Sequence, residues 1–191
     1  MSCILVGNGS SLLDSNYGSV IDSYDNVIRF NRFKTGGFEC NSGVKTTKWY
    51  INAALKDSRY VTDVICDMPP IHVTLFTWTN TYQYYIEYCD FFKARNLKHQ
   101  MDYIPSTMLS EMSAYIGTSY KSWSTGAIAA WSELKCNNKI SLVGFDWWSG
   151  RMKHHYCDMM EFKSSPGGHD PQIEKVFFDK LCKENRLDFI S

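Results

Sequence analysis

The stretch CILVGNGSSLL, residues 3–13, gives the clearest indication of how this chain folds. Its first four residues, Cys3–Val6, are all apolar, which is typical of a strand buried on both faces of a sheet. Glycines at positions 7 and 9 favour a tight turn, and the leucines that follow indicate the start of a helix. Such a turn directs backbone N–H groups toward a bound anion. The stretch therefore predicts a strand, a turn and a helix, with an anion-binding place beside the turn.

Segments with the composition of strands alternate along the chain with segments that have a helical pattern. The sequence predicts six strands, at Cys3–Val6, Val27–Phe30, Thr46–Ile51, His72–Thr77, Ile140–Val143 and Leu187–Ile190. It predicts three helices, at Thr81–Ala94, Gly126–Leu134 and Pro171–Glu184, and no clear pattern over 104–123, with loop over 117–123. This alternation predicts the α/β class: a single Rossmann-like domain over residues 1–191, with a mainly parallel sheet flanked by helices.

Length and charge exclude several classes of protein. The 191 residues suffice for one sizeable core, and 20 Lys and Arg balance 20 Asp and Glu without a long basic run. Such a chain is not suited to nucleic acid or to an anionic membrane surface. No apolar run approaches the ~20 residues that span a bilayer, and no signal peptide fits before Cys3. The chain is therefore expected to be soluble and cytoplasmic, in a microbe or virus, unless it is a trimmed secretory domain.

The sequence does not indicate a metal site. Seven cysteines contain no CxxC pair, no Asp-x-Asp triplet occurs, and reduced thiols fit a cytoplasmic protein. His154 and His155 are adjacent without a third ligand at a suitable spacing, so they indicate an anion contact or a solvated loop. Trp147 and Trp148 follow a predicted strand, where they either stack on a base or sugar or cover the core.

Polar residues follow four of the predicted strands. Asn8, Asn31, Asn52 and Asp146 each come directly after a strand or its turn. Ligands of parallel sheets bind beyond the carboxyl ends of the strands, so these side chains are expected to face a common site. The alternative for any single asparagine is a turn-forming role.

The triplet Ser124-Thr125-Gly126 opens the apolar helix that follows it. Ser124 is a suitable N-cap, and capping alone would stabilise the helix by ~1 kcal/mol. The functional alternative is that the hydroxyls and N–H groups at this helix start bind a carboxylate or phosphate. The triplet by itself does not decide between the two.

His169 stands just before the last predicted helix. Proline favours the first helical position, which makes Asp170 the N-cap, His169 the residue before it and Glu174 the fourth helical residue. Side chains at those two positions usually meet, so a contact between His169 and Glu174 is predicted. A carboxylate on one ring nitrogen would fix the tautomer and make the other nitrogen more basic. The alternative is a surface histidine beside an exposed glutamate.

Four segments in this order resemble the motifs of the eukaryotic sialyltransferases. Residues 6–10 (VGNGS), 25–31 (DNVIRFN) and 43–47 (GVKTT) resemble the large sialyl motif, and residues 124–145 resemble the small one. The run 155–158 (HYCD) is similar to the third motif, and His169 with Glu174 to the very small motif. Bacterial sialyltransferases of a second family are also similar, at Asn52, at Gly144-x-Asp146 and at Gly168-His169.

The resemblance implies an inverting, metal-independent enzyme of the GT-A variant type without a cofactor. The implied sugar donor is CMP-sialic acid and the implied acceptor is a glycan, with a galactoside expected. By position, Asn8 and Asn31 would contact the nucleotide, and Gly9, Ser10 and Asn52 are expected among the other residues that bind the substrate. Ser124, Thr125 and Gly126 would hold the sugar carboxylate and the ribose. His155, helped by Trp148, would steady the leaving phosphate, and His169, with Glu174 behind it, would be the general base.

Two other functions remain open from the sequence. One is a transferase that uses another CMP-activated acidic sugar, such as a Kdo-like sugar, because its pocket would be nearly the same. The other is a relative that binds nucleotide without turnover, although such a protein needs no proton acceptor. In the eukaryotic family the large and small motifs are joined by a disulfide. Cys3 and Cys136 stand at or near the matching positions, so a bond between them is a further expectation.

Overall fold

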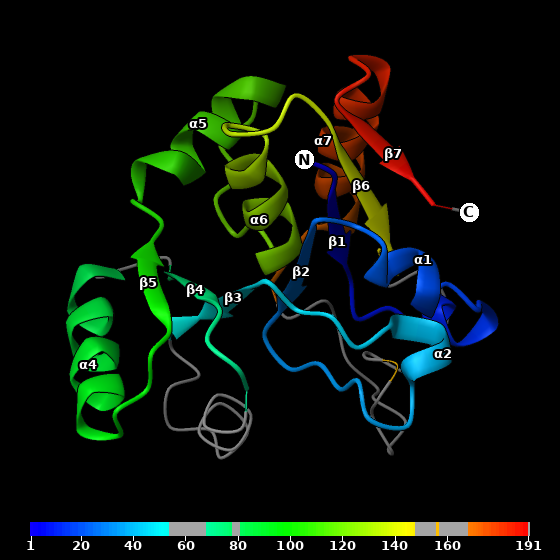
Figure 1. The fold of residues 1–191 in the computed structure, drawn as a ribbon. Helices are drawn as coiled ribbons and strands as arrows, with labels where there is room; N and C mark the ends of the chain where they lie inside the picture. Colours follow the sequence, from blue (N-terminus) through cyan, green and yellow to red (C-terminus); the bar gives the residue numbers. More distant parts are fainter. Residues whose placement is uncertain (54–67, 78–80, 148–155, 157–167, 191) are drawn as a thin grey trace.

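The computed structural model describes residues 1–53, 68–77, 81–147, 156 and 168–190. Its centre is a seven-stranded sheet in the order β5-β4-β3-β2-β1-β6-β7, and every neighbouring pair is parallel (Figure 1). The strands are β1 (Cys3–Val6), β2 (Asn26–Phe30), β3 (Lys48–Asn52), β4 (His72–Phe76), β5 (Gln100–Tyr103), β6 (Ile140–Val143) and β7 (Leu187–Phe189). The predicted α/β class with a parallel sheet is confirmed, and β5 is a strand that the sequence did not indicate.

Alternate side chains of β1 point to opposite faces of the sheet and enter different cores. Leu5 lies in a core with residues of α5 (Thr107–Ile116), α6 (Thr125–Glu133) and α7 (Pro171–Lys183). Ile4 and Val6 lie in a second core with Leu12 and Ile21. Because β1 is covered on both faces, its sequence reads as a continuous apolar run, as predicted.

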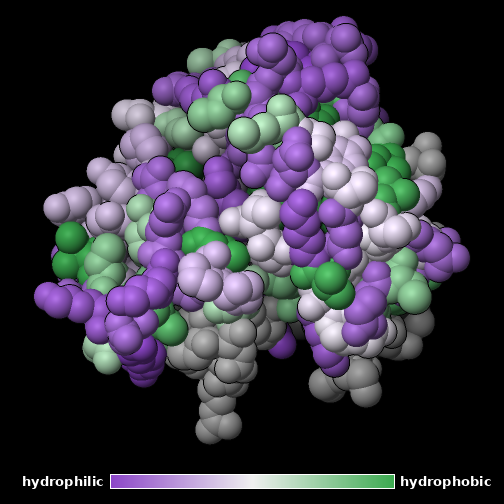
Figure 2. All heavy atoms as spheres, in the orientation of Figure 1, coloured by the Kyte–Doolittle hydropathy of each residue, from purple (hydrophilic) through white to green (hydrophobic). Residues whose placement is uncertain are grey.

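Helix α4 (Thr81–Ala94) covers the other face over β3 and β4, through Tyr88 and Phe92. Both it and the group of α5, α6 and α7 can be followed in Figure 1. On the side of the molecule in Figure 2, hydrophobic residues form separate green patches among hydrophilic ones. The core residues, by contrast, are buried in the two layers around the sheet.

The segment behind the first turn is shorter than expected. It is a five-residue 3₁₀ helix, η1 (Ser10–Asp14), and two further short helices follow at α1 (Gly18–Asp22) and α2 (Glu39–Ser42). A 3₁₀ segment of five residues sums only a few peptide dipoles, so its N-terminus attracts an anion less strongly than the start of a longer α-helix would. Conversely, α5 lies within the region 104–123, where no clear pattern was found.

Strand order reverses at β1, since the strands that follow it in sequence extend to one side up to β5 and then to the other from β6. In open α/β sheets, ligands bind at such a reversal, beyond the carboxyl ends of the strands. The turns after β1, β2 and β6 therefore define the region in which a site is expected.

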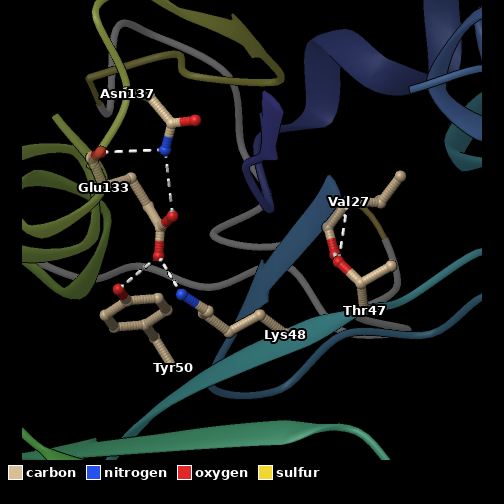
Figure 3. Close-up of polar contacts among 6 residues, drawn as sticks. All are labelled: Val27, Thr47, Lys48, Tyr50, Glu133 and Asn137. Carbon is tan, nitrogen blue, oxygen red and sulfur yellow. Dashed lines mark hydrogen bonds and ion pairs between the residues drawn. The ribbon is translucent and has the colours of Figure 1, made fainter. Parts of the chain in front are cut away.

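A buried polar contact fixes the far end of α6 to the sheet. The carboxylate oxygen Oε1 of Glu133 lies 2.6 Å from Lys48 Nζ and accepts a 2.6 Å hydrogen bond from the Tyr50 hydroxyl (Figure 3). Burial, and then the charge of Glu133, raises the pKa of Tyr50 well above its usual value, so the phenol stays protonated and donates. The C-terminal end of α6 is thus bound to β3, which leaves its N-terminal end facing the strand reversal.

Candidate active site

Ser124 caps α6 as predicted. It has an extended backbone, and its hydroxyl oxygen accepts a hydrogen bond of 3.3 Å from Ala127 N. The glycine at 126 is required by close packing, because a Cβ at this position would lie 2.8 Å from the Phe145 ring. The helix start therefore sits directly against the turn that follows β6.

Asn31 joins the ends of β2 and β3 to the start of α6. Its backbone is left-handed, with φ 39°, and its Nδ2 donates to Thr125 Oγ1 at 2.8 Å. Its Oδ1 accepts from Asn52 N at 2.9 Å, and its carbonyl accepts from Trp49 Nε1 at 2.9 Å. Three of the predicted site residues, Asn31, Asn52 and Thr125, are thus held together by hydrogen bonds.

Asn8 lies at the neighbouring strand end. Its Nδ2 donates to Phe30 O at 3.2 Å, and its own carbonyl accepts from Tyr156 N at 2.8 Å. Its Oδ1 is buried and has no hydrogen-bond partner among the described residues. Buried acceptors are nearly always paired, so this oxygen marks a place where a ligand group could donate. The Tyr156 ring, nearly fully buried, holds this segment in place through hydrogen bonds between its hydroxyl and the Lys34 backbone.

The turn after β1 already holds an anion, which belongs to the protein itself. Asp146 accepts a hydrogen bond from Ser11 N at 3.0 Å and one from the Ser11 hydroxyl, and its Oδ2 lies 3.4 Å from Ser10 Oγ. Gly9 permits this approach, because a Cβ there would lie 2.5 Å from Asp146 Cγ. The sequence marked Asp146 only as a strand-end residue. The predicted anion cradle of this turn is therefore occupied, at Ser11 N, by a carboxylate.

Glu174 contacts Ser124 and not His169, so the predicted contact between His169 and Glu174 is wrong. Glu174 Oε1 accepts from Ser124 N at 2.6 Å, and Oε2 accepts from Ser124 Oγ at 2.7 Å. Glu174 is only 2% exposed, and this burial raises its pKa to about 7 against the lowering effect of the two Ser124 hydrogen bonds. The reason for the difference is that the carboxylate turns inward to satisfy the N–H that precedes α6.

His169 is held by a backbone carbonyl instead. Its Nδ1 lies 2.6 Å from Ser122 O, in the loop that leads to α6. The predicted helix start is confirmed, because Asp170 Oδ1 accepts from Gln172 N at 2.9 Å and from Ile173 N at 3.2 Å, with Pro171 at the first position. The ring is therefore fixed between the starts of α6 and α7.

Several predicted residues fall outside the described part of the chain. These are His154, His155 and Trp148, while Trp147 is described and packs on Phe178 and Phe189, with ring centroids 5.8 and 5.2 Å away. Of the two tryptophans, Trp147 thus covers the core.

Cys3 and Cys136 are free cysteines in this structure, so the expected disulfide is not present here. Cys3 lies in the core at the start of β1, and Cys136 is exposed. Burial, followed by the charge of Glu133, raises the pKa of the Cys3 thiol to about 12, so this side chain remains neutral. A neutral, buried thiol of this kind is poorly reactive.

The predicted residues that the structure describes therefore converge on one region. Asn8 lies beside β2, Asn31 binds Thr125, Ser124 binds Glu174, and the carbonyl two residues before Ser124 binds His169. A family model described as glycosyltransferase family 29 (sialyltransferase) matches residues 1–186. The chain belongs to this family.

Named relatives of the family 29 chain match it over different lengths. It is 51% identical over 45 residues, 24% of the chain, to human CMP-N-acetylneuraminate-beta-galactosamide-alpha-2,3-sialyltransferase 1. It is 26% identical over 97% of its length to mouse CMP-N-acetylneuraminate-beta-galactosamide-alpha-2,3-sialyltransferase 2. It is also 47% identical over 53 residues, 28% of the chain, to Beta-1,6-galactosyltransferase GALT29A of Arabidopsis thaliana.

A solved structure has the same fold. A crystal structure of a mammalian sialyltransferase in complex with Gal-beta-1-3GalNAc-ortho-nitrophenol matches with a TM-score of 0.76 and 22% identity, covering 99% of this chain and 68% of that one. The alignments cover 13% of the human relative and 55% of the mouse relative, so the family 29 chain matches little more than half of the latter.

The relatives correct the expected location. They are eukaryotic enzymes, from mammals and a plant, which makes the expectation of a cytoplasmic microbial or viral enzyme wrong. The expectation rested on the absence of a long apolar run, and this absence says nothing about the compartment in which a folded domain works. None of the helices in the described part of the chain has the length and apolar character to cross a bilayer.

Proposed function

We propose that this family 29 chain transfers sialic acid from CMP-sialic acid to a hydroxyl group of an acceptor glycan, with a galactoside as the expected acceptor. The observation that carries the proposal is the position of His169, held by Ser122 O beside the capped start of α6. A proton acceptor and a helix N-terminus at one site are the two elements that this transfer requires. Family membership and the fold support the same activity.

The contact with Ser122 O supports Nε2 as the atom of His169 that would act as the base. A carbonyl oxygen can only accept a hydrogen bond, so Nδ1 carries the proton when the ring is neutral. The lone pair then lies on Nε2, which is the nitrogen that would remove the proton from the acceptor hydroxyl. A neutral imidazole suits this task near pH 7, and a positioned base contributes typically 10²–10⁴-fold to the rate.

The start of α6 would bind the charged part of the sugar donor. Helix N-termini favour anions, and the Thr125 and Ser124 hydroxyls lie at this end with Asn31 beside them. The donor of this reaction carries a carboxylate on the sugar and a phosphate on the leaving group. Asn8 Oδ1, which lacks a partner among the described residues, would accept a hydrogen bond from the nucleotide.

The reaction would proceed with inversion. The anomeric carbon is hindered and lies beside a carboxylate, so the bond to the phosphate loosens first and an oxocarbenium-like transition state forms. The acceptor oxygen attacks from the face opposite to the departing CMP while His169 takes its proton. By position in the motifs, His155 and Trp148 would steady the phosphate, and no metal or cofactor is part of the proposal. Glu174 would act behind the site by fixing Ser124.

Two other sugar donors remain candidates. The matched plant relative bears the name of a galactosyltransferase, so local identity to a family member does not by itself select the donor. A Kdo-like CMP-sugar would place the same charges in the same positions. A nucleotide-binding protein without turnover is a third possibility, but its site would gain nothing from a fixed imidazole.

The decisive experiment is a panel of nucleotide sugars tested with and without β-galactosides. We expect release of CMP from CMP-sialic acid that increases with the acceptor, is unchanged by EDTA, and gives a product of inverted anomeric configuration. Release of UDP from UDP-galactose, or of CMP from CMP-Kdo, without release of CMP from CMP-sialic acid would contradict the proposal. The result would select the galactosyltransferase or the Kdo transferase, respectively. Binding of CMP without release from any donor would select the non-catalytic alternative.

A further inference from the structure

Tyr120 lies between the two segments that hold His169. The amide N–H of Asp170, the residue after His169, donates to the Tyr120 hydroxyl oxygen at 2.6 Å. The same hydroxyl donates to Ser122 O at 2.8 Å. Because Ser122 O also lies 2.6 Å from His169 Nδ1, the Tyr120 hydroxyl is connected to His169 twice, through the Ser122 carbonyl and through the Asp170 amide that follows His169 in the chain.

The Ser122 carbonyl therefore uses both of its lone pairs. One accepts from His169 Nδ1 and the other from the Tyr120 hydroxyl. A carbonyl with one partner in an exposed loop can rotate with its peptide plane, whereas two partners in fixed directions hold that plane. The direction of the carbonyl in turn sets the direction of the His169 ring.

Tyr120 is itself held firmly. Its ring packs edge-on against the buried Trp123 ring, with centroids 5.1 Å apart, and its carbonyl accepts from the buried Ser113 hydroxyl. Its backbone N–H donates to Thr118 Oγ1 at 3.2 Å. Burial raises the pKa of its hydroxyl to about 12, so the group stays protonated and can donate over the range in which an enzyme works.

We infer that Tyr120 is a positioning residue for His169, and that its hydroxyl holds the Ser122 carbonyl so that the imidazole keeps its proton on Nδ1 and presents Nε2 as the base. The inference rests on the proposed function only in naming His169 as the base. Nothing in the sequence pointed to this role, since Tyr120 lies in the predicted loop 117–123 and outside the four motifs.

The test compares Tyr120→Phe with Tyr115→Phe. Phenylalanine keeps the ring against Trp123 and removes only the hydroxyl. Tyr115 is the matched control, because its hydroxyl also bonds across to α7, but at Glu184 Oε2 (2.7 Å) at the opposite end of the helix. Nitrogen-15 NMR of the His169 ring reports which nitrogen carries the proton, and steady-state kinetics separate kcat from KM for CMP-sialic acid.

We expect the fraction of the Nδ1–H tautomer to fall in Tyr120→Phe and kcat to decrease about 10-fold, with KM for the sugar donor changed less than 2-fold. Tyr115→Phe should change neither the tautomer nor kcat. An unchanged tautomer in Tyr120→Phe overturns the inference whatever the rate, and so does a variant that fails to fold. A tautomer shift in a protein inactive with every sugar donor would uphold the inference and reject the proposed function.

Discussion

Both carboxylate oxygens of Glu174 are hydrogen-bonded to Ser124, one to its backbone N–H at 2.6 Å and the other to its hydroxyl at 2.7 Å. Ser124 caps α6, and Glu174 lies in the first turn of α7. This pair of contacts joins the N-terminal ends of two helices that are far apart in the sequence. Because His169 precedes α7 directly, the same pair sets the distance between the imidazole and the start of α6.

Replacing Glu174 by Gln should change how stability depends on pH. Burial raises the folded-state pKa of Glu174 to about 7, above the ~4.3 of an unfolded glutamate. Between these two pKa values the native state binds more protons than the unfolded state. The contribution of Glu174 to the free energy of unfolding is therefore most favourable below pH 4, and it is lost as pH rises through 7. The shift corresponds to about 4 kcal/mol of unfolding free energy. Urea unfolding at pH 5, 6, 7 and 8 should therefore show Glu174→Gln gaining stability relative to wild type as pH rises. A constant difference would show that the carboxylate is not the titrating group.

Gly9→Ala should destabilise the protein through Asp146. The added Cβ would lie 2.5 Å from Asp146 Cγ, so the carboxylate must move away from the Ser11 amide that it binds. Overpacking of this kind costs about 1–3 kcal/mol. The cost should be smaller in an Asp146→Ala background, where the obstructing group is absent, and a double-mutant cycle by urea unfolding measures the difference. Additive effects would mean that the two positions do not interact.

Lys48→Met should weaken the attachment of α6 to the sheet. It removes the cation 2.6 Å from the buried Glu133 carboxylate and leaves Tyr50 and Asn137 as its hydrogen-bond donors. Removing one partner of a fully buried pair costs 3–5 kcal/mol, and since the Lys48 side chain is 26% exposed, about 1–3 kcal/mol is expected here. The double variant Lys48→Met/Glu133→Gln should regain part of this loss in thermal unfolding. If the double variant is less stable than Lys48→Met, the loss in Lys48→Met does not come from leaving the Glu133 carboxylate without its cation.

The sequence predicted the parts of the fold that are determined by residues within a single short segment. The strand Cys3–Val6 is apolar throughout because both its faces are buried, and Asp170 with Pro171 marks the start of α7 through capping chemistry. The strand Gln100–Tyr103 was missed because it lies at the edge of the sheet with most of its side chains exposed. The helix Thr107–Ile116 was missed although Met108, Leu109 and Met112 have helical spacing, because polar residues interrupt that stripe.

The candidate site divides in the same way. Asn8, Asn31, Ser124 and His169 could be found because strand ends and helix starts are readable from residue types and spacing. The partners of His169 and Glu174 could not, because they depend on which loop lies opposite. A backbone carbonyl such as that of Ser122 leaves no mark in the sequence, and the contact of Asp146 with Ser11 joins segments 135 residues apart.

His169→Ala should separate chemistry from binding. The variant removes the base but leaves the α6 start, Asn8 and Asn31 in place, because the hydrogen bonds that position them do not involve the imidazole. Turnover of CMP-sialic acid should fall about 10²–10⁴-fold, while CMP binds with nearly the wild-type affinity in calorimetry. His169→Gln serves as a second variant, since its amide can still donate to Ser122 O but offers no basic nitrogen. It should be as inactive as His169→Ala, and turnover near the wild-type level in either variant would exclude His169 as the base.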